Sequence, residues 1–328
     1  MYKNSKVLVA GGTGTIGVPL VRELIKRGAK VRVVSLEPEI IARGKIQDEF
    51  EFYQFDLTKP EHCLKAVANQ RFVFNLLGIK GSVGLGETKV ASYLIPMLRF
   101  QTNLMEAAFY EGIERFLFVG SICSYPRSTM HYEENMWNGM PQQNDRIPGI
   151  AKRVGELLGE AFYLEHGWNA VRIVRPANVY GPYDDLNPKT AQVIPALITR
   201  MLTGENPVSI WGDGSAVRDF IFSADVAYWM CEALEKAPPN WPINLGSGLG
   251  LTIKEVAEAI ASLVNPIPQL KWDPYKPAGD PCRILAMERA KKVLGYYQRT
   301  SLADGLTKTI KWCQSQLEQD FRADKIND

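Results

Sequence analysis

Short apolar runs alternate with helical patterns along the first half of the chain. The runs are rich in β-branched and aromatic residues, which is typical of strands buried on both faces. Between them, apolar residues recur at helical spacing, as in residues 18–28 and 93–112. The predicted strands are residues 6–10, 30–35, 50–56, 71–78 and 115–121. Because alternating strands and helices fold as parallel sheets with crossover helices, we expect an α/β, Rossmann-type doubly wound sheet.

From about Asp184 the predicted elements become shorter, and Pro and Gly interrupt them more often. A long helix over residues 150–167 and a strand leading into a loop over 169–182 still continue the first pattern. We therefore expect a Rossmann domain over residues 1–183 and a smaller C-terminal α/β lobe over residues 184–328. A strand and a helix near residues 217–246 are expected to return to the first domain.

Composition narrows the class of protein. The chain has 328 residues, 46% hydrophobic and 23% charged, as in ordinary globular proteins. Its net charge is only +2, without a block of like charges, which argues against nucleic-acid or membrane-surface binding. No apolar stretch approaches the roughly 18 residues that span a bilayer, and the first residues run into a strand rather than a signal peptide. We expect a cytoplasmic protein.

The five cysteines and three histidines do not form a ligand pattern. The cysteines are widely spaced and the histidines are not at ligand spacing, so we expect reduced thiols and no metal site.

A glycine-rich segment, GGTGTIG, follows the first predicted strand and precedes the first predicted helix. Glycines in this context allow a tight turn and close approach of a pyrophosphate, while the helix N-terminus supplies N–H donors and positive dipole. The segment therefore predicts a dinucleotide site at Gly11, Gly14 and Gly17. The alternative is a purely structural turn.

The residue that distinguishes NAD from NADP is expected just after the second predicted strand. Glu37 lies about 20 residues beyond the last glycine, where a carboxylate accepts from the adenosine ribose and repels a 2′-phosphate. Ser35 occupies the other register for that acid, which leaves open that Glu37 is a solvated loop carboxylate. The predicted cofactor is NAD.

From Lys6 to about Trp312, the chain resembles the extended short-chain dehydrogenase/reductase family, the nucleotide-sugar epimerases and dehydratases. The segments that carry the resemblance include GGTGTIG, FDLTK, FNLLG, QTNLMEAA, FLFVGSICSYP, RPANVYGP, WGDGSAVRDFIFSADVA and INLGSG. Within the family it is most similar to the GDP-fucose synthase-like enzymes, through GIKGSVG, SICSYP, YGPYDDLNP, QVIPALITR and KPAGDPCR.

The resemblance implies roles for particular residues. Ser121 would bond the reacting sugar hydroxyl, Lys152 would hold the nicotinamide ribose, and Cys123 would serve epimerisation, although such a cysteine is more often a small buried residue. The implied cofactor contacts are Gly11, Thr13, Gly14, Thr15, Ile16, Gly17, Glu37, Asp56, Leu57, Asn75, Leu77, Gly78, Lys152, Pro176, Asn178 and Val179. The implied substrate contacts are Lys80, Ser121, Cys123, Tyr125, Asn178, Gln192, Val193, Trp211, Arg218 and Arg283.

The family's catalytic tyrosine is missing. Its position, four residues before Lys152, is Pro148, and residues 134–151 contain no tyrosine. The histidine that works with the cysteine in fucose synthases falls at Gln192, which cannot transfer a proton in that way.

Three interpretations of the missing tyrosine stay open. In one, hydride transfer continues with the proton passing through Ser121, water, or a tyrosine from elsewhere, such as Tyr125, Tyr132 or Tyr183. In another, the protein binds NAD(H) and a nucleotide sugar without turnover, as a sensor or partner subunit. The third, RNA binding, is disfavoured by the even charge.

The favoured activity is oxidation or reduction at a ring carbon, C4, of a GDP-linked hexose or heptose. We also expect a homodimer that forms through the helices near residues 93–112 and 148–166, by analogy with the family.

Overall fold

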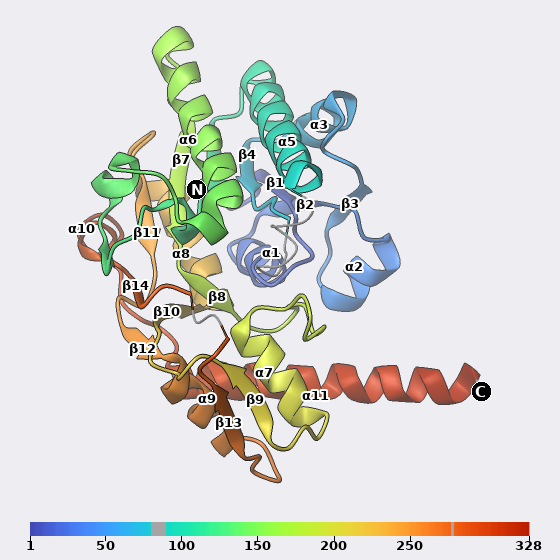
Figure 1. The fold of residues 1–328 in the computed structure, drawn as a ribbon. Coiled ribbons are helices and arrows are strands. Elements are labelled where there is room, and N and C mark those ends of the chain that lie inside the picture. The colour runs from blue at the N-terminus through green and yellow to red at the C-terminus, as the bar shows by residue number, and fades with distance from the viewer. Residues whose placement is uncertain (80–89, 277–278, 328) are drawn as a thin grey trace.

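The computed structural model describes residues 1–79, 90–276 and 279–327. Within these ranges, a parallel sheet of seven strands has the order β11-β7-β5-β4-β1-β2-β3 (Figure 1). Its strands are β1 (Lys6–Ala10), β2 (Lys30–Ser35), β3 (Glu51–Gln54), β4 (Phe72–Asn75), β5 (Arg115–Val119), β7 (Val171–Pro176) and β11 (Ile243–Leu245). The change of direction between β1 and β4 leaves the crevice at their carboxyl ends in which such sheets bind ligands.

Helices cover both faces of this sheet. Side chains alternate along β1, so Val7 and Val9 belong to one buried cluster, whereas Leu8 and Ala10 belong to the other. The first face carries α1 (Gly17–Lys26) and α8 (Ser223–Lys236), and the second carries α3 (Pro60–Val67), α5 (Val90–Glu111) and α6 (Arg146–His166). Helix α2 (Glu39–Lys45) lies beside β3 at the edge. The predicted doubly wound α/β fold is confirmed.

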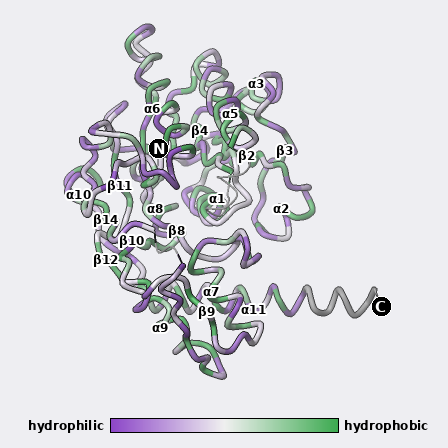
Figure 2. Tube along the Cα trace, in the orientation of Figure 1, coloured by the Kyte–Doolittle hydropathy of each residue, from purple (hydrophilic) through white to green (hydrophobic). Residues whose placement is uncertain are grey.

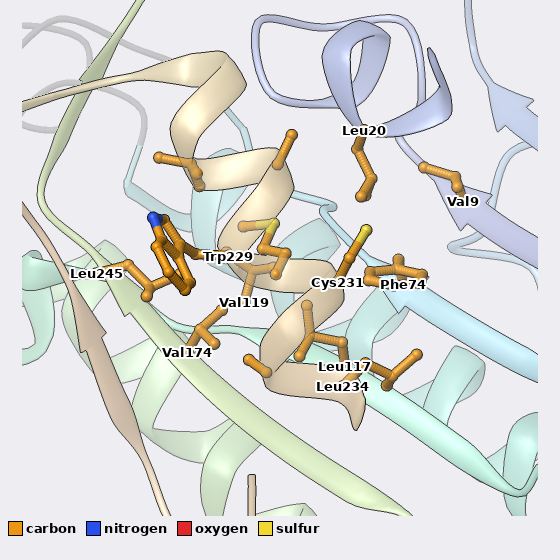
Figure 3. Packing of buried hydrophobic residues seen from close by; sticks show 14 of the residues in the cluster. Val9, Leu20, Phe74, Leu117, Val119, Val174, Trp229, Cys231, Leu234 and Leu245 are labelled. Atoms are coloured by element: carbon orange, nitrogen blue, oxygen red, sulfur yellow. The ribbon is translucent and has the colours of Figure 1, made fainter. Parts of the chain in front are cut away.

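Helix α8 reaches this sheet from the second half of the chain. In Figure 3, Trp229 lies beside Val119 and Val174 of β5 and β7, whereas Cys231 lies toward Phe74 of β4 and Leu234 toward Leu117 of β5. Burying one large apolar side chain stabilises a fold by about 1.5–3 kcal/mol, so this contact fixes α8 firmly. Strand β11 follows α8 and pairs in parallel with β7. The domain boundary expected at residue 183 stays a prediction.

The remaining elements form a second lobe. One sheet has the order β12-β10-β14-β6 with β8 beside β10, and β13 pairs with β9. A third buried cluster lies beneath its helices. The strands are β6 (Met130–His131), β8 (Asn178–Tyr180), β9 (Val208–Trp211), β10 (Val217–Phe222), β12 (Gly250–Thr252), β13 (Leu270–Asp273) and β14 (Cys282–Leu285). Its helices are α7 (Val193–Leu202), α9 (Ile253–Ser262) and α11 (Leu302–Asn327). The exception is α10 (Glu288–Leu294), which packs against α8 and β11 of the central sheet instead.

Helix α11 begins on the second lobe and its far end runs out beyond the body of the molecule (Figure 1). Hydrophobic and hydrophilic residues alternate along its inner half, as expected of a helix that rests one face on a core (Figure 2). In the described part of the chain, no helix has both the length and the apolar character needed to cross a membrane.

Candidate active site

The glycines of the first turn lack side chains for different reasons. Gly11 has a φ of +82°, a backbone conformation that favours glycine. A Cβ added at Gly17 would lie 2.4 Å from the Gly11 carbonyl oxygen, so α1 can pack against the turn only with glycine there. A Cβ at Gly14 would meet nothing within 4 Å. The open side of the turn is therefore at Gly14, where a ligand backbone can approach.

The N-terminus of α1 faces this turn without a side-chain cap. The N-cap residue is Ile16, which has no acceptor, and the first helical turn contains no acidic residue. The positive end of the helix dipole is thus left for an external anion. Thr13 Oγ1 lies 2.8 Å from Ser35 Oγ, and Thr15 Oγ1 donates to the Tyr183 carbonyl at 3.3 Å. These two hydroxyls tie the turn to β2 and to the 181–183 loop.

Ser35 and Glu37, the two positions at which the sequence allowed the ribose-binding acid, differ in their surroundings at the end of β2. Ser35 is buried, and its hydroxyl accepts from the Glu37 backbone N–H at 3.1 Å. The Glu37 carboxylate lies further out and accepts from Lys45 Nζ at 2.8 and 2.9 Å. Ser35 therefore shapes the bend, and Glu37 is the acidic group at the strand end, paired with a lysine.

Five predicted cofactor contacts lie at the end of β4 and in the loops that follow β3 and β4. Asp56 accepts from Thr58 N at 3.0 Å and from Thr58 Oγ1 at 2.7 Å. Burial raises the pKa of the Asp56 carboxyl, but these hydrogen bonds outweigh it and hold the pKa below its usual value. Leu57 is buried, and Asn75 Oδ1 accepts from Leu77 N at 3.1 Å. Gly78 has open space where a Cβ would lie.

Lys152 joins α6 to the end of β4. Its Nζ donates to the Leu77 carbonyl at 2.9 Å and lies 5.3 Å from the Phe118 ring centroid. Helix α6 can come this close to β5 only because Gly155 has no side chain. A Cβ at this position would lie 2.1 Å from the Phe118 ring. Burial lowers the pKa of Lys152 to about 8. The ammonium is thus a buried charge beside the strand ends.

Ser121 and Cys123 lie in the short turn that follows β5, the 3₁₀ turn η1 (Ile122–Ser124). Ser121 Oγ accepts from Cys123 N at 3.1 Å. Burial, followed by the charge of Asp145, raises the pKa of the Cys123 thiol to about 11. Cys123 also lies within electrostatic reach of Lys152, so the structure brings the three residues predicted to be catalytic into one region.

Arg283 and Asp145 complete this cluster. Arg283 Nη1 donates to Asp145 Oδ2 at 2.5 Å, and its Nη2 donates to the Ile122 carbonyl at 3.0 Å. Asp145 ends the 3₁₀ turn η3 (Gln143–Asp145), just before α6. Sequence reasoning predicted Arg283 as a substrate contact and missed Asp145, because the two lie 138 residues apart and only the fold joins them.

Tyr93 of α5 is a second residue that sequence reasoning missed. Its hydroxyl donates to the Ile79 carbonyl, next to the loop that Lys152 contacts. Burial, followed by the charges of Cys123 and Asp145, raises the pKa of Tyr93 to about 12. A tyrosine therefore lies within electrostatic reach of the cluster, although it comes from a different helix than the family's tyrosine.

Arg218 and Asp219 differ sharply in surroundings. Arg218 lies on β10 in register with Arg283 on β14, and its Nη1 donates to the Asp280 carbonyl at 2.6 Å. Asp219 is fully buried and accepts from Ser247 N at 2.7 Å and from two further backbone N–H groups. Asp219 is thus a structural anchor, whereas the two arginines form a cationic pair on the two inner strands of this sheet.

Three further predicted contacts lie around this anchor. Asn178 Nδ2 donates to the Asp219 carbonyl at 2.8 Å, and Val179 is half-buried beside it on β8. Pro176 ends β7, paired with Leu245 of β11.

The prediction that Tyr125 contacts substrate is wrong. The side chain is fully buried, its hydroxyl donates to Asn244 Oδ1 at 2.6 Å, and it accepts from Arg175 Nη1 at 2.8 Å. Burial also raises the pKa of this phenol, and both of these partners of its hydroxyl are protein side chains, so it does not face a ligand. The chain turns inward directly after η1, which the local sequence did not reveal.

Of the other tyrosines considered, Tyr132 is exposed, and Tyr183 accepts from Arg22 Nη2 at 3.0 Å at the protein surface. Gln192 is the exposed N-cap residue of α7 and Val193 is its first helical residue. Trp211 is 61% exposed at the end of β9. Their roles stay predictions, and Lys80 lies outside the described residues.

Comparison with known proteins identifies this arrangement. The family model described as NAD dependent epimerase/dehydratase family matches residues 7–246. The chain belongs to the NAD-dependent epimerase/dehydratase family. The prediction that the chain is an enzyme of the extended short-chain dehydrogenase/reductase type is thereby confirmed. The cofactor of this family is NAD(P). Among the described residues of this epimerase/dehydratase, no group of three or more His, Cys, Asp or Glu side chains could hold a metal ion.

Relatives cover nearly the whole chain. GDP-L-fucose synthase 1 of Arabidopsis thaliana is 30% identical over 94% of this chain and 93% of its own length. The UDP-glucose 4-epimerase of Thermotoga maritima, solved with UDP-glucose, is 27% identical with a TM-score of 0.84, over 95% and 99% of the two chains. A GDP-L-fucose synthetase from Naegleria fowleri, solved with NADP, shares the fold at 20% identity and a TM-score of 0.81, over 97% and 96%.

Proposed function

We propose that this epimerase/dehydratase catalyses oxidation or reduction at C4 of a GDP-linked hexose or heptose with a nicotinamide dinucleotide. The observation that carries the proposal is the buried Lys152 ammonium, which bonds Leu77 beside Ser121 and Cys123. Burying a lysine ammonium costs free energy, so a buried lysine near other candidate residues is itself a candidate for a functional role.

The residues of the first turn fit a dinucleotide. The open side at Gly14 and the uncapped N-terminus of α1 suit a pyrophosphate. When bound, the nicotinamide would accept or supply the hydride at the sugar carbon. Lys152 would hold the ribose next to it, and Leu77 would fix the direction of the lysine side chain.

We infer that NAD is preferred to NADP because Glu37 presents its carboxylate at the end of β2. Lys45 neutralises part of that charge, so the preference depends on the pair. Calorimetric titration with NAD and NADP tests the inference. Lys45→Ala should widen the gap between the two affinities, and Glu37→Ala should close it; a wild type that binds NADP more tightly would contradict the inference.

The two arginines support a diphosphate-linked substrate. Arg218 and Arg283 lie side by side on β10 and β14, so both positive charges would attract a phosphate group bound there. We propose Arg218 as the direct phosphate contact, because a planar guanidinium can bind a phosphate through two parallel hydrogen bonds. GDP as the carrier is supported by the names of the relatives, which include GDP-L-fucose synthases and a GDP-L-colitose synthase.

The experiment that tests the function is mass spectrometry of ligands released from the purified protein, followed by single-turnover NADH absorbance with candidate GDP-sugars. We expect a nicotinamide dinucleotide and a redox signal, and Lys152→Met should abolish that signal. A protein that binds neither ligand by calorimetry would overturn the proposal, and an unchanged rate for Lys152→Met would show that the active site lies elsewhere.

A second candidate is a sensor or partner subunit that binds both ligands without turnover. Pro148 in place of the tyrosine favours it, since general acid–base assistance contributes about 10²- to 10⁴-fold to rate. Demonstrated binding of both ligands without any single-turnover signal would select this alternative.

We also propose a homodimer formed through α5 and α6. Apolar side chains recur on α6 at helical spacing and are exposed in the single chain: Val154, Leu157, Ala161 and Leu164. Tyr110 of the neighbouring α5 is 72% exposed. A second copy of the same two helices would cover this stripe.

A further inference from the structure

The proposed function, on which this inference rests, needs a proton acceptor near the position of the missing tyrosine. Pro148 lies in the first turn of α6, where proline is tolerated, so the helix itself is intact. Three polar side chains lie within electrostatic reach of one another near the start of this helix: Tyr93 of α5, Cys123 of η1 and Asp145, the N-cap residue of α6.

Asp145 is fixed more firmly than the other two. Arg283 clamps it, donating to Asp145 Oδ2 at 2.5 Å while its second nitrogen holds the Ile122 carbonyl. The start of α6 fits closely against η1, since a Cβ at Gly149 would lie 2.3 Å from the Cys123 carbonyl oxygen. The Arg283 side chain is 10% exposed, whereas that of Asp145 is 22% exposed. The carboxylate is thus anchored on one side and accessible on the other.

The Cys123 thiol lies close enough to Asp145 and Ser121 for both to influence its pKa, and the Cys123 backbone N–H donates to Ser121 Oγ at 3.1 Å. Burial and the Asp145 charge keep the pKa of the thiol near 11, so at neutral pH it is a hydrogen-bond donor rather than a base. An ionised carboxylate only accepts hydrogen bonds, which makes Asp145 the acceptor of this pair. Tyr93 already donates to Ile79.

We propose that Asp145 accepts the proton of the reacting sugar hydroxyl, in place of the tyrosine that is absent at Pro148. In the oxidation, the hydroxyl proton passes to an Asp145 oxygen, the hydrogen on the same carbon leaves as hydride to the nicotinamide, and the alcohol becomes a ketone. The reduction reverses these transfers. Cys123 remains protonated and orients Asp145, so carbon epimerisation does not accompany the redox step.

The contact between Asp145 and the thiol is tested without turnover. Alkylation of Cys123 by iodoacetamide is followed against pH by peptide mass spectrometry, with half-buried Cys282 as the internal reference. Asp145→Asn should move the Cys123 midpoint to lower pH, because a negative neighbour is lost. Asp280→Asn removes a different carboxylate beside Arg283 and should leave the midpoint in place. An unmoved midpoint in Asp145→Asn would overturn the proposal.

The proton role is tested by single-turnover rates. Asp145→Asn should slow the redox step by about 10²- to 10⁴-fold, while affinities for NAD and GDP-sugar change only a few-fold. Tyr93→Phe should keep most of the rate. If Asp145→Asn does not fold, Asp145→Asn combined with Arg283→Met removes the unpaired guanidinium and should show the same loss.

The outcomes separate the two levels of proposal. An active wild type with an equally active Asp145→Asn variant, or with the loss found in Tyr93→Phe instead, overturns only the role of Asp145. Deuterium incorporated at C3 or C5 during turnover in D₂O would overturn the claim that Cys123 stays a donor. A wild type without any redox signal overturns the proposed function and the role of Asp145 together.

Discussion

At the residue scale, the proposed cofactor side of the site depends on glycine and lysine. Gly14 and Gly17 are three residues apart, yet a side chain would meet open space at one and backbone at the other. Lys152 is held in a pocket that disfavours its charge. Position in the fold, rather than residue type, therefore decides what a substitution at each of these residues does.

The two glycines give a matched pair of variants. Gly14→Ala should leave the melting temperature unchanged within a few degrees and weaken NAD binding by more than tenfold, because the methyl group occupies the approach of the pyrophosphate. Gly17→Ala should lower the free energy of unfolding by several kcal/mol, since its Cβ would contact the Gly11 carbonyl. Thermal unfolding and calorimetry check both; normal NAD affinity in a folded Gly14→Ala variant would contradict the assigned site.

Lys152→Met should stabilise the protein at pH 7. The folded-state pKa of Lys152 is about 8, against 10.5 for the free side chain, so between these values the unfolded chain binds more protons. Below pH 8 the folded state bears the cost of a buried charge, about 3 kcal/mol at 1.4 kcal/mol per unit. The gain of the variant should shrink toward pH 10.5, as urea unfolding at pH 7 and pH 10 can measure. A variant less stable at pH 7 would contradict the burial cost.

At the element scale, α6 is joined to β7 by a buried ion pair. Arg175 bonds both Glu156 oxygens, at 2.9 and 2.6 Å, and both side chains are at most 5% exposed. The remaining Arg175 donor bonds Tyr125 and the Glu133 carbonyl. This network holds α6, the helix that carries Lys152, against β7.

Glu156→Gln should therefore destabilise the fold by about 3–5 kcal/mol, because a buried guanidinium would lose its counter-charge. Glu39→Gln, which removes the exposed partner of Arg43, should cost less than about 1 kcal/mol. Denaturant unfolding of the two variants compares a buried with an exposed pair. Equal losses would show that the network on α6 is not structural.

At the scale of the whole molecule, two copies are expected to meet through α5 and α6. The exposed stripe on α6 contains Leu157 and Leu164, which lie seven residues apart on one helix face. The rest of α6 packs on the central sheet, so this face is the one that remains available.

Leu157→Glu combined with Leu164→Glu should convert the dimer to a monomer, since charges cannot be buried in an apolar interface. Leu64→Glu, on α3, places a charge at an equally exposed leucine away from the stripe and should leave the oligomeric state unchanged. Light scattering after size exclusion reads the mass. A wild-type monomer, or a double variant that remains dimeric, would contradict this interface.

The sequence alone determined the sheet, the glycine turn and the gap at Pro148, because each depends on residues that are contiguous or fixed by a helical spacing. Strand and helix periodicities are local, and the turn is seven consecutive residues. Tertiary structure alone decided that Tyr125 points into the core and that Lys45 pairs with Glu37. It also brought Asp145 to Arg283 from 138 residues away. Such contacts depend on how strand ends and helix starts align in space, which no local pattern records.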